Sequence, residues 1–139
     1  MAKTYKELKD RLTDFGFEED DVAESEYKRI YQNSFNQAGE VIFYSVMLPV
    51  EDYIRKIEEL EDDDDLTPIT KIKDDTADDA KIQIPDIVVP LYVLLAAHYA
   101  WLDDDITKST IYYNEFDDMK NQFITNATKV KKATIEGGF

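Results

Sequence analysis

The sequence predicts a mainly α-helical protein, a small bundle of four to five helices with a short β-hairpin inserted around residues 69–84. Apolar residues recur at three- and four-residue spacing over most of the chain, which is typical of amphipathic helices. Residues 87–102 are almost wholly apolar, interrupted only by Pro90 and His98. Two short runs, 69–73 and 80–84, instead alternate apolar and polar residues, as strands do. With 139 residues, we expect one helical domain over 1–133 and a flexible C-terminal tail over 134–139.

The first helix is predicted over residues 5–15. Thr4 and Glu7 have the spacing of a capping box, in which the Thr hydroxyl accepts from an amide three residues on. Leu8, Leu12 and Phe15 then follow at helical spacing, and a glycine at position 16 suits the end of a helix.

The second helix is predicted to begin at Val22 or Glu26 and to end at Val46. One face carries apolar or small residues at a period near 3.6: Tyr27, Ile30, Tyr31, Ser34, Ala38, Val41, Ile42 and Ser45. The small residues there, together with Gly39, would let another helix approach closely. Pro49 ends the regular pattern, and residues 51–60 have helical character again.

Residues 58–84 are predicted to form an insertion, an acidic loop followed by the β-hairpin. The run 61–65 is entirely acidic, so like-charge repulsion favours an exposed loop. Residues 74–79 are acidic or turn-forming and separate the two alternating runs. An isolated hairpin is marginally stable in water, so we expect it to lean on the helices or on a neighbouring subunit.

The most distinctive stretch, residues 85–123, is predicted to be a helical hairpin. Its first helix, 86–102, is apolar nearly all round and therefore central, with Pro90 tolerated in the first turn. Asp103–Asp105 form an acidic corner, and Asp105 is a plausible N-cap for a second helix over 106–131. Lys129, Lys131 and Lys132 suit the negative end of that helix dipole.

The net charge of −15 restricts the classes of partner. It argues against general binding of nucleic acid or anionic membranes, because phosphates would be repelled. Three explanations of the charge stay open: solubility, a cationic partner, or a surface that must not adhere to DNA. No apolar run reaches the about 20 residues that span a bilayer, and no signal peptide is visible, so we expect a soluble intracellular protein.

The sequence favours a protein without catalysis, cofactor or metal. It has no cysteine and a single histidine, His98, so neither a catalytic triad nor a His/Cys metal cluster can be assembled. Phosphate-binding glycine motifs are absent. The acidic tracts lack the glycine and the alternation of a calcium loop.

Aromatic residues gather along the predicted helical hairpin: Tyr92, Tyr99, Trp101, Tyr112, Tyr113 and Phe116. Such a set is typical of the seam between two packed helices, and some of its members could face a neighbouring subunit. The lysines at 129, 131 and 132 with Phe139 form a basic segment and an apolar hook, interpreted either as a plain helix end or as a docking tail that orders on a partner.

The hairpin resembles the head–tail connector proteins of tailed phages, also called head-completion or neck adaptor proteins. The resemblance rests on the helix LYVLLAAHYAWL, the corner Asp103-Asp104-Asp105 and the triplet Asn114-Glu115-Phe116. It extends to the opening TYKELKDRL and to Asn33-Ser34-Phe35-Asn36-Gln37-Ala38, and so covers most of the chain, although the acidic middle of the chain departs from it.

The resemblance implies a virion protein of the phage neck, assembled in the host cytoplasm. Members of the family form a ring, usually of twelve subunits, beneath the portal protein; the ring extends the DNA channel and receives further neck or tail-completion proteins. It also implies that the C-terminal part, with Lys129, Lys131, Lys132 and Phe139, faces the portal. A bore that lets DNA pass without binding should repel phosphate, and the acidic loop Asp62, Asp63, Asp64 and Asp65 is the natural candidate to line it.

Two rival functions compete with the connector. An acidic inhibitor that mimics DNA could occupy a host nuclease or restriction enzyme, although its carboxylates should be spread along one elongated face. A regulatory binding module for a basic partner is the third alternative.

Overall fold

The computed structural model describes residues 2–18, 27–61 and 64–136. Their helices and strands are β1 (Ala2–Thr4), α1 (Tyr5–Arg11), η1 (Leu12–Phe15), α3 (Lys28–Ile42), the π-helical η3 (Phe43–Met47), η4 (Leu48–Val50), α4 (Glu51–Ile57), β2 (Lys81–Gln83), η5 (Asp86–Val88), α5 (Val89–Trp101) and α6 (Ile106–Glu136). The predicted mainly α fold class, a small bundle with a short antiparallel β pair, is confirmed.

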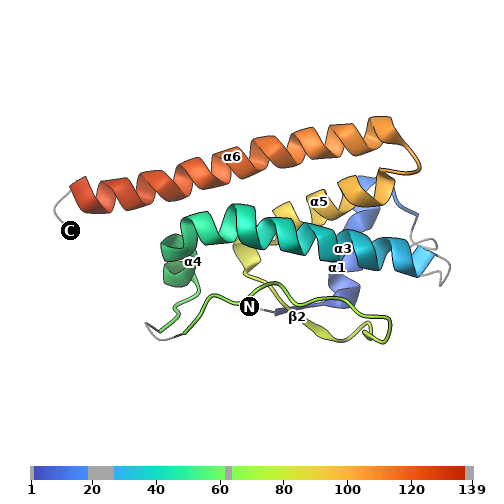
Figure 1. Cartoon of the computed structure of the whole chain (residues 1–139), viewed down its shortest axis with the longest axis horizontal. Helices are drawn as coiled ribbons and strands as arrows, with labels where there is room; N and C mark the ends of the chain where they lie inside the picture. Colours follow the sequence, from blue (N-terminus) through green and yellow to red (C-terminus); the bar gives the residue numbers. More distant parts are fainter. Residues whose placement is uncertain (1, 19–26, 62–63, 137–139) are drawn as a thin grey trace.

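Helix α5 is the centre of the bundle and lies between α3 and α6 (Figure 1). Nine of its thirteen residues are buried, because an apolar surface all round a helix has to be covered on several sides. Pro90 stands in the first turn, where its missing N–H would have had no helical partner. The predicted central helix is therefore confirmed.

The N-terminal helix also follows the prediction. Thr4 Oγ1 accepts a hydrogen bond from the amide of Glu7 at 3.1 Å, and α1 continues through the short 3₁₀ helix η1. Gly16 then ends the helix with a φ of +90°, a left-handed conformation that favours glycine.

The second long helix departs from a regular α-helix at its C-terminal end. It is α-helical to Ile42, π-helical over residues 43–47 and 3₁₀-helical through Pro49. Pro49 has no N–H to donate and its ring crowds the carbonyl four residues earlier, so the hydrogen-bond pattern changes there. The predicted starts, Val22 and Glu26, lie outside the described residues.

The strand predicted at 80–84 is present as β2, but its predicted partner is wrong. β2 pairs antiparallel with β1, with Lys3 opposite Ile82, and residues 69–73 form no strand. That run still lies beside β2, because Thr70 donates its amide to Gln83 O at 3.4 Å and accepts from the Gln83 amide at 2.9 Å. The alternation of apolar and polar residues in 80–84 indicates a strand, but it does not show whether that strand pairs with residues 69–73 or with the N-terminus.

Residues 66–73, which we call the strap, run alongside α3 at the lower side of the molecule (Figure 1). The side chain of Asn36 holds the strap, since it donates to Ile72 O at 2.8 Å and accepts from Ile72 N at 2.7 Å. Ile69 and Ile72 are buried in the common core. The segment expected to be an insertion is thus part of the bundle's packing.

Hydrogen bonds from two lysines and a glutamine link the turn after the strap, residues 74–79, to α1 and α3. Lys9 Nζ lies 2.6 Å from Asp78 Oδ1, and this hydrogen bond holds the pKa of Asp78 below its ordinary value. Lys28 donates to the carbonyl of Asp74, whose carboxylate accepts from Gln32 at 3.1 Å.

Helix α6 begins as predicted, with the Asp105 carboxylate accepting from the amide of Lys108 at 3.1 Å, but it runs to Glu136. The flexible tail predicted from Thr134 is therefore wrong for residues 134–136, which are helical. Residues 137–139 lie outside the described residues. Over the part of the chain that the structure describes, no helix is long and apolar enough to cross a membrane.

Candidate assembly surfaces

The predicted aromatic seam is divided among three separate contacts of α5. Tyr99 and Tyr113 flank His98 between α5 and α6, with ring centroids 4.9 and 5.0 Å from the imidazole. Phe116 is buried in the same contact, 6.0 Å from Tyr113. Tyr113 remains 42% exposed, so it is the member of this group that could also meet another molecule.

His98 and Ser109 lock the α5–α6 hairpin. Ser109 is fully buried and its Oγ donates to the carbonyl of His98 at 2.9 Å. The His98 Nδ1 lies 2.8 Å from the carbonyl oxygen of Ser109, so this nitrogen carries the proton and donates. This satisfied pair gives the single histidine a structural explanation.

Trp101 fastens the N-terminal segment to α5. Its Nε1 donates to Phe15 O at 2.9 Å, and its ring stacks on Phe17 with centroids 4.5 Å apart. The ammonium of Lys108, a residue of α6, lies 4.2 Å from the centre of the Trp101 ring. Trp101 therefore joins three segments and does not belong to the α5–α6 contact alone.

Tyr92 packs against α3 on the opposite side of α5. Its ring centroid lies 5.3 Å from that of Phe35, and a Cβ at Gly39 would be 3.4 Å from the Tyr92 ring. This close approach is the role expected for the small residues of α3. The Tyr92 hydroxyl is buried and has no hydrogen-bond partner in the described part of the chain.

Replacing Tyr92 with phenylalanine is expected to leave stability at pH 7 unchanged or raised by about 1 kcal/mol, since it removes an unsatisfied buried hydroxyl. Burial raises the pKa of Tyr92 well above its ordinary value and the pKa of Tyr5 to about 12. Above pH 10 these tyrosines ionise first in the unfolded chain, so stability falls as pH rises from 10 toward the folded pKa values. Tyr92→Phe should flatten that loss by about 1.4 kcal/mol per pH unit.

Urea denaturation at pH 7, 10 and 11 measures this effect. Tyr44→Phe is the matched control, because Tyr44 is 62% exposed. A Tyr92→Phe protein that is clearly less stable than the wild type at pH 7, or whose stability has the wild-type pH dependence, would contradict the burial of an unpaired Tyr92 hydroxyl.

The predicted acidic loop follows α4. Glu59 takes the left-handed position with a φ of 54°, and Leu60 N donates back to Arg55 O at 3.0 Å, which closes α4. Asp64 and Asp65 are exposed, whereas Asp62 and Asp63 lie outside the described residues. The loop is thus exposed where it is described, and its orientation in an assembly stays a prediction.

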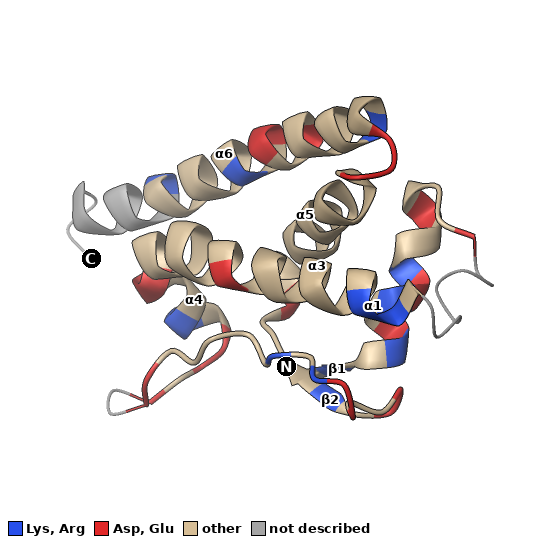
Figure 2. Cartoon of the chain, turned by 45° about the vertical axis from the view of Figure 1, so that its right-hand side comes forward, with Lys and Arg blue, Asp and Glu red and all other residues tan. Residues whose placement is uncertain are grey.

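Acidic residues gather in a few exposed segments (Figure 2). The loop after α4 and the corner Asp103–Asp105 lie at opposite ends of the molecule. In contrast, residues 28–50 contain Lys28 and Arg29 against Glu40 alone, a net +1. Residues 106–136 contain five lysines and four acids, also +1. The long helices therefore carry none of the net negative charge.

The predicted basic docking segment lies at the far end of α6, which extends past α4 (Figure 1). Lys129 is exposed, and Lys131 and Lys132 belong to the last turns of the helix. Phe139 lies outside the described residues. Because α6 runs on to Glu136, none of the three lysines lies in its last turn, where the predicted interaction with the helix dipole would act.

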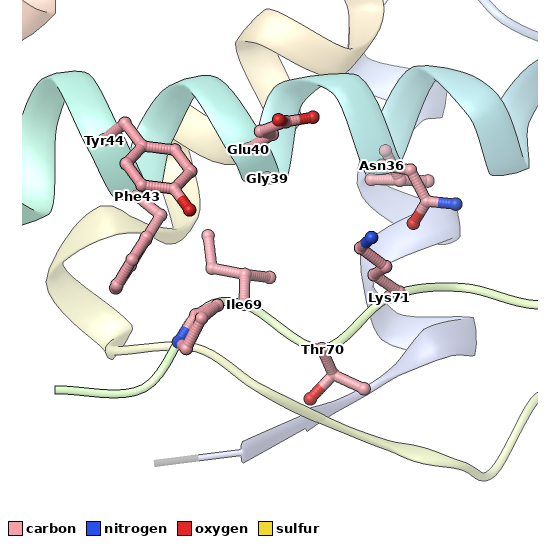
Figure 3. A pocket seen from close by; sticks show the side chains of 10 residues that line it. Asn36, Gly39, Glu40, Phe43, Tyr44, Ile69, Thr70 and Lys71 are labelled. Atoms are coloured by element: carbon pink, nitrogen blue, oxygen red, sulfur yellow. The ribbon is translucent and has the colours of Figure 1, made fainter. Parts of the chain in front are cut away.

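A groove of about 260 Å³ lies between α3 and the strap. Figure 3 shows Tyr44 and Phe43 at one end of it, Ile69 on the strap, and Glu40 and Lys71 toward the other end. The absence of a side chain at Gly39 leaves room for the strap to approach α3. The groove is amphipathic and open to solvent at the exposed Tyr44.

The sequence reasoning did not single out Asn36 or Tyr44. Asn36 lies in the stretch that carries the family resemblance. Its amide side chain has both a donor and an acceptor, so it can hydrogen-bond to both backbone groups of a neighbouring residue. Tyr44 falls outside the buried face at helical spacing, and an exposed aromatic residue is a signal for an interface.

Among the described residues no group of three or more His, Cys, Asp or Glu side chains is arranged to hold a metal ion. Comparison of the chain with family models, with curated proteins and with solved structures found no match in any of the three.

Proposed function

We propose that the chain is a subunit of a ring-shaped head–tail connector of a tailed phage, a structural protein without catalysis. In this role it docks under the portal protein, extends the DNA channel and receives further neck or tail-completion proteins. The proposal rests on the residues that resemble this family, which lie mainly on α3, α5, the acidic corner and α6. It places the protein in the virion neck after assembly in the host cytoplasm.

The segregation of charge is the observation that carries the proposal. A ring of identical subunits, usually twelve in the family, has to keep like charges apart at every interface while presenting a bore that repels phosphate. Exposed acids on the loop after α4 and on the corner Asp103–Asp105, with long helices of net +1, meet both requirements. The acidic loop at 62–65 is the proposed channel-facing segment.

Assembly state tests the proposal directly. Light scattering and negative-stain imaging of the purified protein, alone and with the portal protein of the same phage, should yield rings or portal-dependent particles. A protein that stays monomeric or dimeric under both conditions would overturn the connector function.

Portal docking is proposed for the end of α6. The triple replacement of Lys129, Lys131 and Lys132 with glutamine should weaken portal binding by at least tenfold, because it removes three positive charges from one end of the helix. The fold should stay intact. The combined replacement of three exposed lysines elsewhere, Lys56, Lys73 and Lys81, with glutamine is the control for loss of charge alone. Equal binding by the two variants would remove the end of α6 from the portal contact.

An acidic DNA mimic is the second candidate, favoured by the charge of −15. Such an inhibitor competes for the basic groove of a nuclease through carboxylates spaced like phosphates. The loop after α4 and the corner Asp103–Asp105 lie at opposite ends of the molecule, which argues against one continuous acidic face. Inhibition of a host nuclease by a monomer that ignores the portal would support the mimic and exclude the connector.

A further inference from the structure

The outward side of α3 and η4 carries a row of uncharged residues, with Arg29 and Glu40 exposed along its edge and Val41 partly buried against the core. Its members recur at spacings of three and four residues, which place them on one face of a helix: Ile30, Asn33, Gln37, Val41, Tyr44 and Leu48. We call this set the α3 stripe. Ile30 is 47% and Tyr44 62% exposed, although both are large and partly apolar.

The row contains three exposed large apolar side chains, Ile30, Tyr44 and Leu48, on a chain with a net charge of −15. Exposed apolar residues that line up in this way mark a contact with another molecule more often than scattered ones do. Tyr44 also lies in the π-helical turn, a rare conformation found frequently at functional sites. At Tyr44 the stripe meets the groove beside the strap (Figure 3).

The outer face of α6 has the complementary chemistry. Helical spacing places Ile111, Glu115, Asp118 and Gln122 together on the side away from the buried Phe116. All four are exposed, and Ile111 retains 50% of its accessible surface. The acids of this face match Arg29, which is exposed beside the first turn of the α3 stripe.

We propose that the α3 stripe receives the outer face of α6 from a second copy of the chain. This inference rests on the connector function and names the surfaces that form its ring. Ile111 packs against the uncharged residues of the stripe, and Glu115 and Asp118 lie toward Arg29. Because the two surfaces differ, the contact is head-to-tail, and each subunit can bind one neighbour through each face, as a closed ring requires.

A mixing experiment tests this arrangement. One variant, Ile30→Glu with Tyr44→Glu, blocks the stripe and keeps α6. The other, Ile111→Arg, blocks the outer face of α6 and keeps the stripe. Each alone should be monomeric where the wild type assembles, with association weakened at least tenfold. An equimolar mixture should form a one-to-one dimer that grows no further, since one intact pair of faces remains. Light scattering and native mass spectrometry measure the species.

Ile57→Glu is the control, because Ile57 is exposed to a similar degree, 43%, on α4. It should assemble like the wild type. Circular dichroism verifies the fold of every variant.

Three results would overturn the inference, and they differ from failure of the connector function. Assembly of either variant alone as in the wild type shows that its substituted face is not used, and absence of the dimer in the mixture excludes the pairing. Assembly of Ile111→Arg but not of the stripe variant indicates a symmetric contact between two α3 helices. A wild type that remains monomeric with and without the portal refutes the connector and this interface together.

Discussion

Replacing Phe35 with alanine is expected to lower the free energy of unfolding by about 3–5 kcal/mol. Phe35 is fully buried, with its ring centroid 6.0 Å from that of Tyr5 on α1 and 5.3 Å from that of Tyr92 on α5. The smaller side chain leaves a cavity where three helices meet, and the aromatic neighbours cannot collapse into it without leaving their own contacts. A loss of this size is a large part of the about 5–15 kcal/mol that stabilises a domain.

Urea or thermal denaturation measures this change. Tyr44→Ala is the matched control, because it removes an aromatic ring of similar size from an exposed position on the same long helix. Measured on the monomer, its effect should lie within about 0.5 kcal/mol, whereas Tyr44 also belongs to the proposed subunit contact of the assembled chain. A Phe35→Ala protein as stable as the Tyr44→Ala protein would contradict the packing of α1, α3 and α5.

Replacing Asn36 with alanine is expected to cost about 2–3 kcal/mol, since two hydrogen bonds to the Ile72 backbone are lost at about 1 kcal/mol each and their partners are left unsatisfied. The strap should detach from α3 before the bundle unfolds, because the clamp is the direct polar link between Ile72 and the helix. Hydrogen exchange of the amides of residues 66–73 should accelerate at least tenfold while α5 stays protected.

Two further substitutions isolate the clamp. Asn121→Ala removes an exposed amide on α6 and should change neither stability nor exchange. Asn36→Asp keeps an acceptor for the Ile72 amide but loses the donor to its carbonyl, so its effect should be intermediate. Wild-type exchange of the strap in Asn36→Ala would show that β2 and the buried isoleucines hold it alone.

The loss of the strap should also bear on assembly. The strap forms one wall of the groove that ends at Tyr44, a member of the α3 stripe. An Asn36→Ala protein that still folds therefore tests whether assembly requires the groove in addition to the α3 stripe. If this variant assembles like the wild type, the stripe is sufficient without the groove.

The helices were predictable because their signals are local. The Thr4 cap, the left-handed Gly16, Pro90 in a first turn and the Asp105 cap each depend on a few neighbouring residues, and each is present as predicted. Residues 134–136 were predicted as part of a flexible tail because the last few residues of a chain are usually poorly ordered. Helix α6 continues because its own sequence supports helical hydrogen bonds up to Glu136.

The candidate sites were less predictable. The acidic loop is exposed where it is described, as like charges require, but its position in the proposed ring would depend on neighbouring subunits. The aromatic set divides into three contacts because α5 has different partners around its circumference, and spacing along one helix does not say which partner each residue meets.

The sequence by itself determined the helical class, the helix caps at Thr4, Gly16 and Asp105 and the segregation of charge, since propensity, capping and composition act over a few residues. Only the tertiary structure decided that β2 pairs with the N-terminus, that Asn36 clamps the strap and that α3 keeps a row of uncharged residues on its outer side. Asn36 and Ile72 are 36 positions apart, and the paired residues of β1 and β2 are 77 to 81 positions apart. Alternation and periodicity specify which face of a segment is apolar, whereas the partner that covers it is chosen by packing of the whole core.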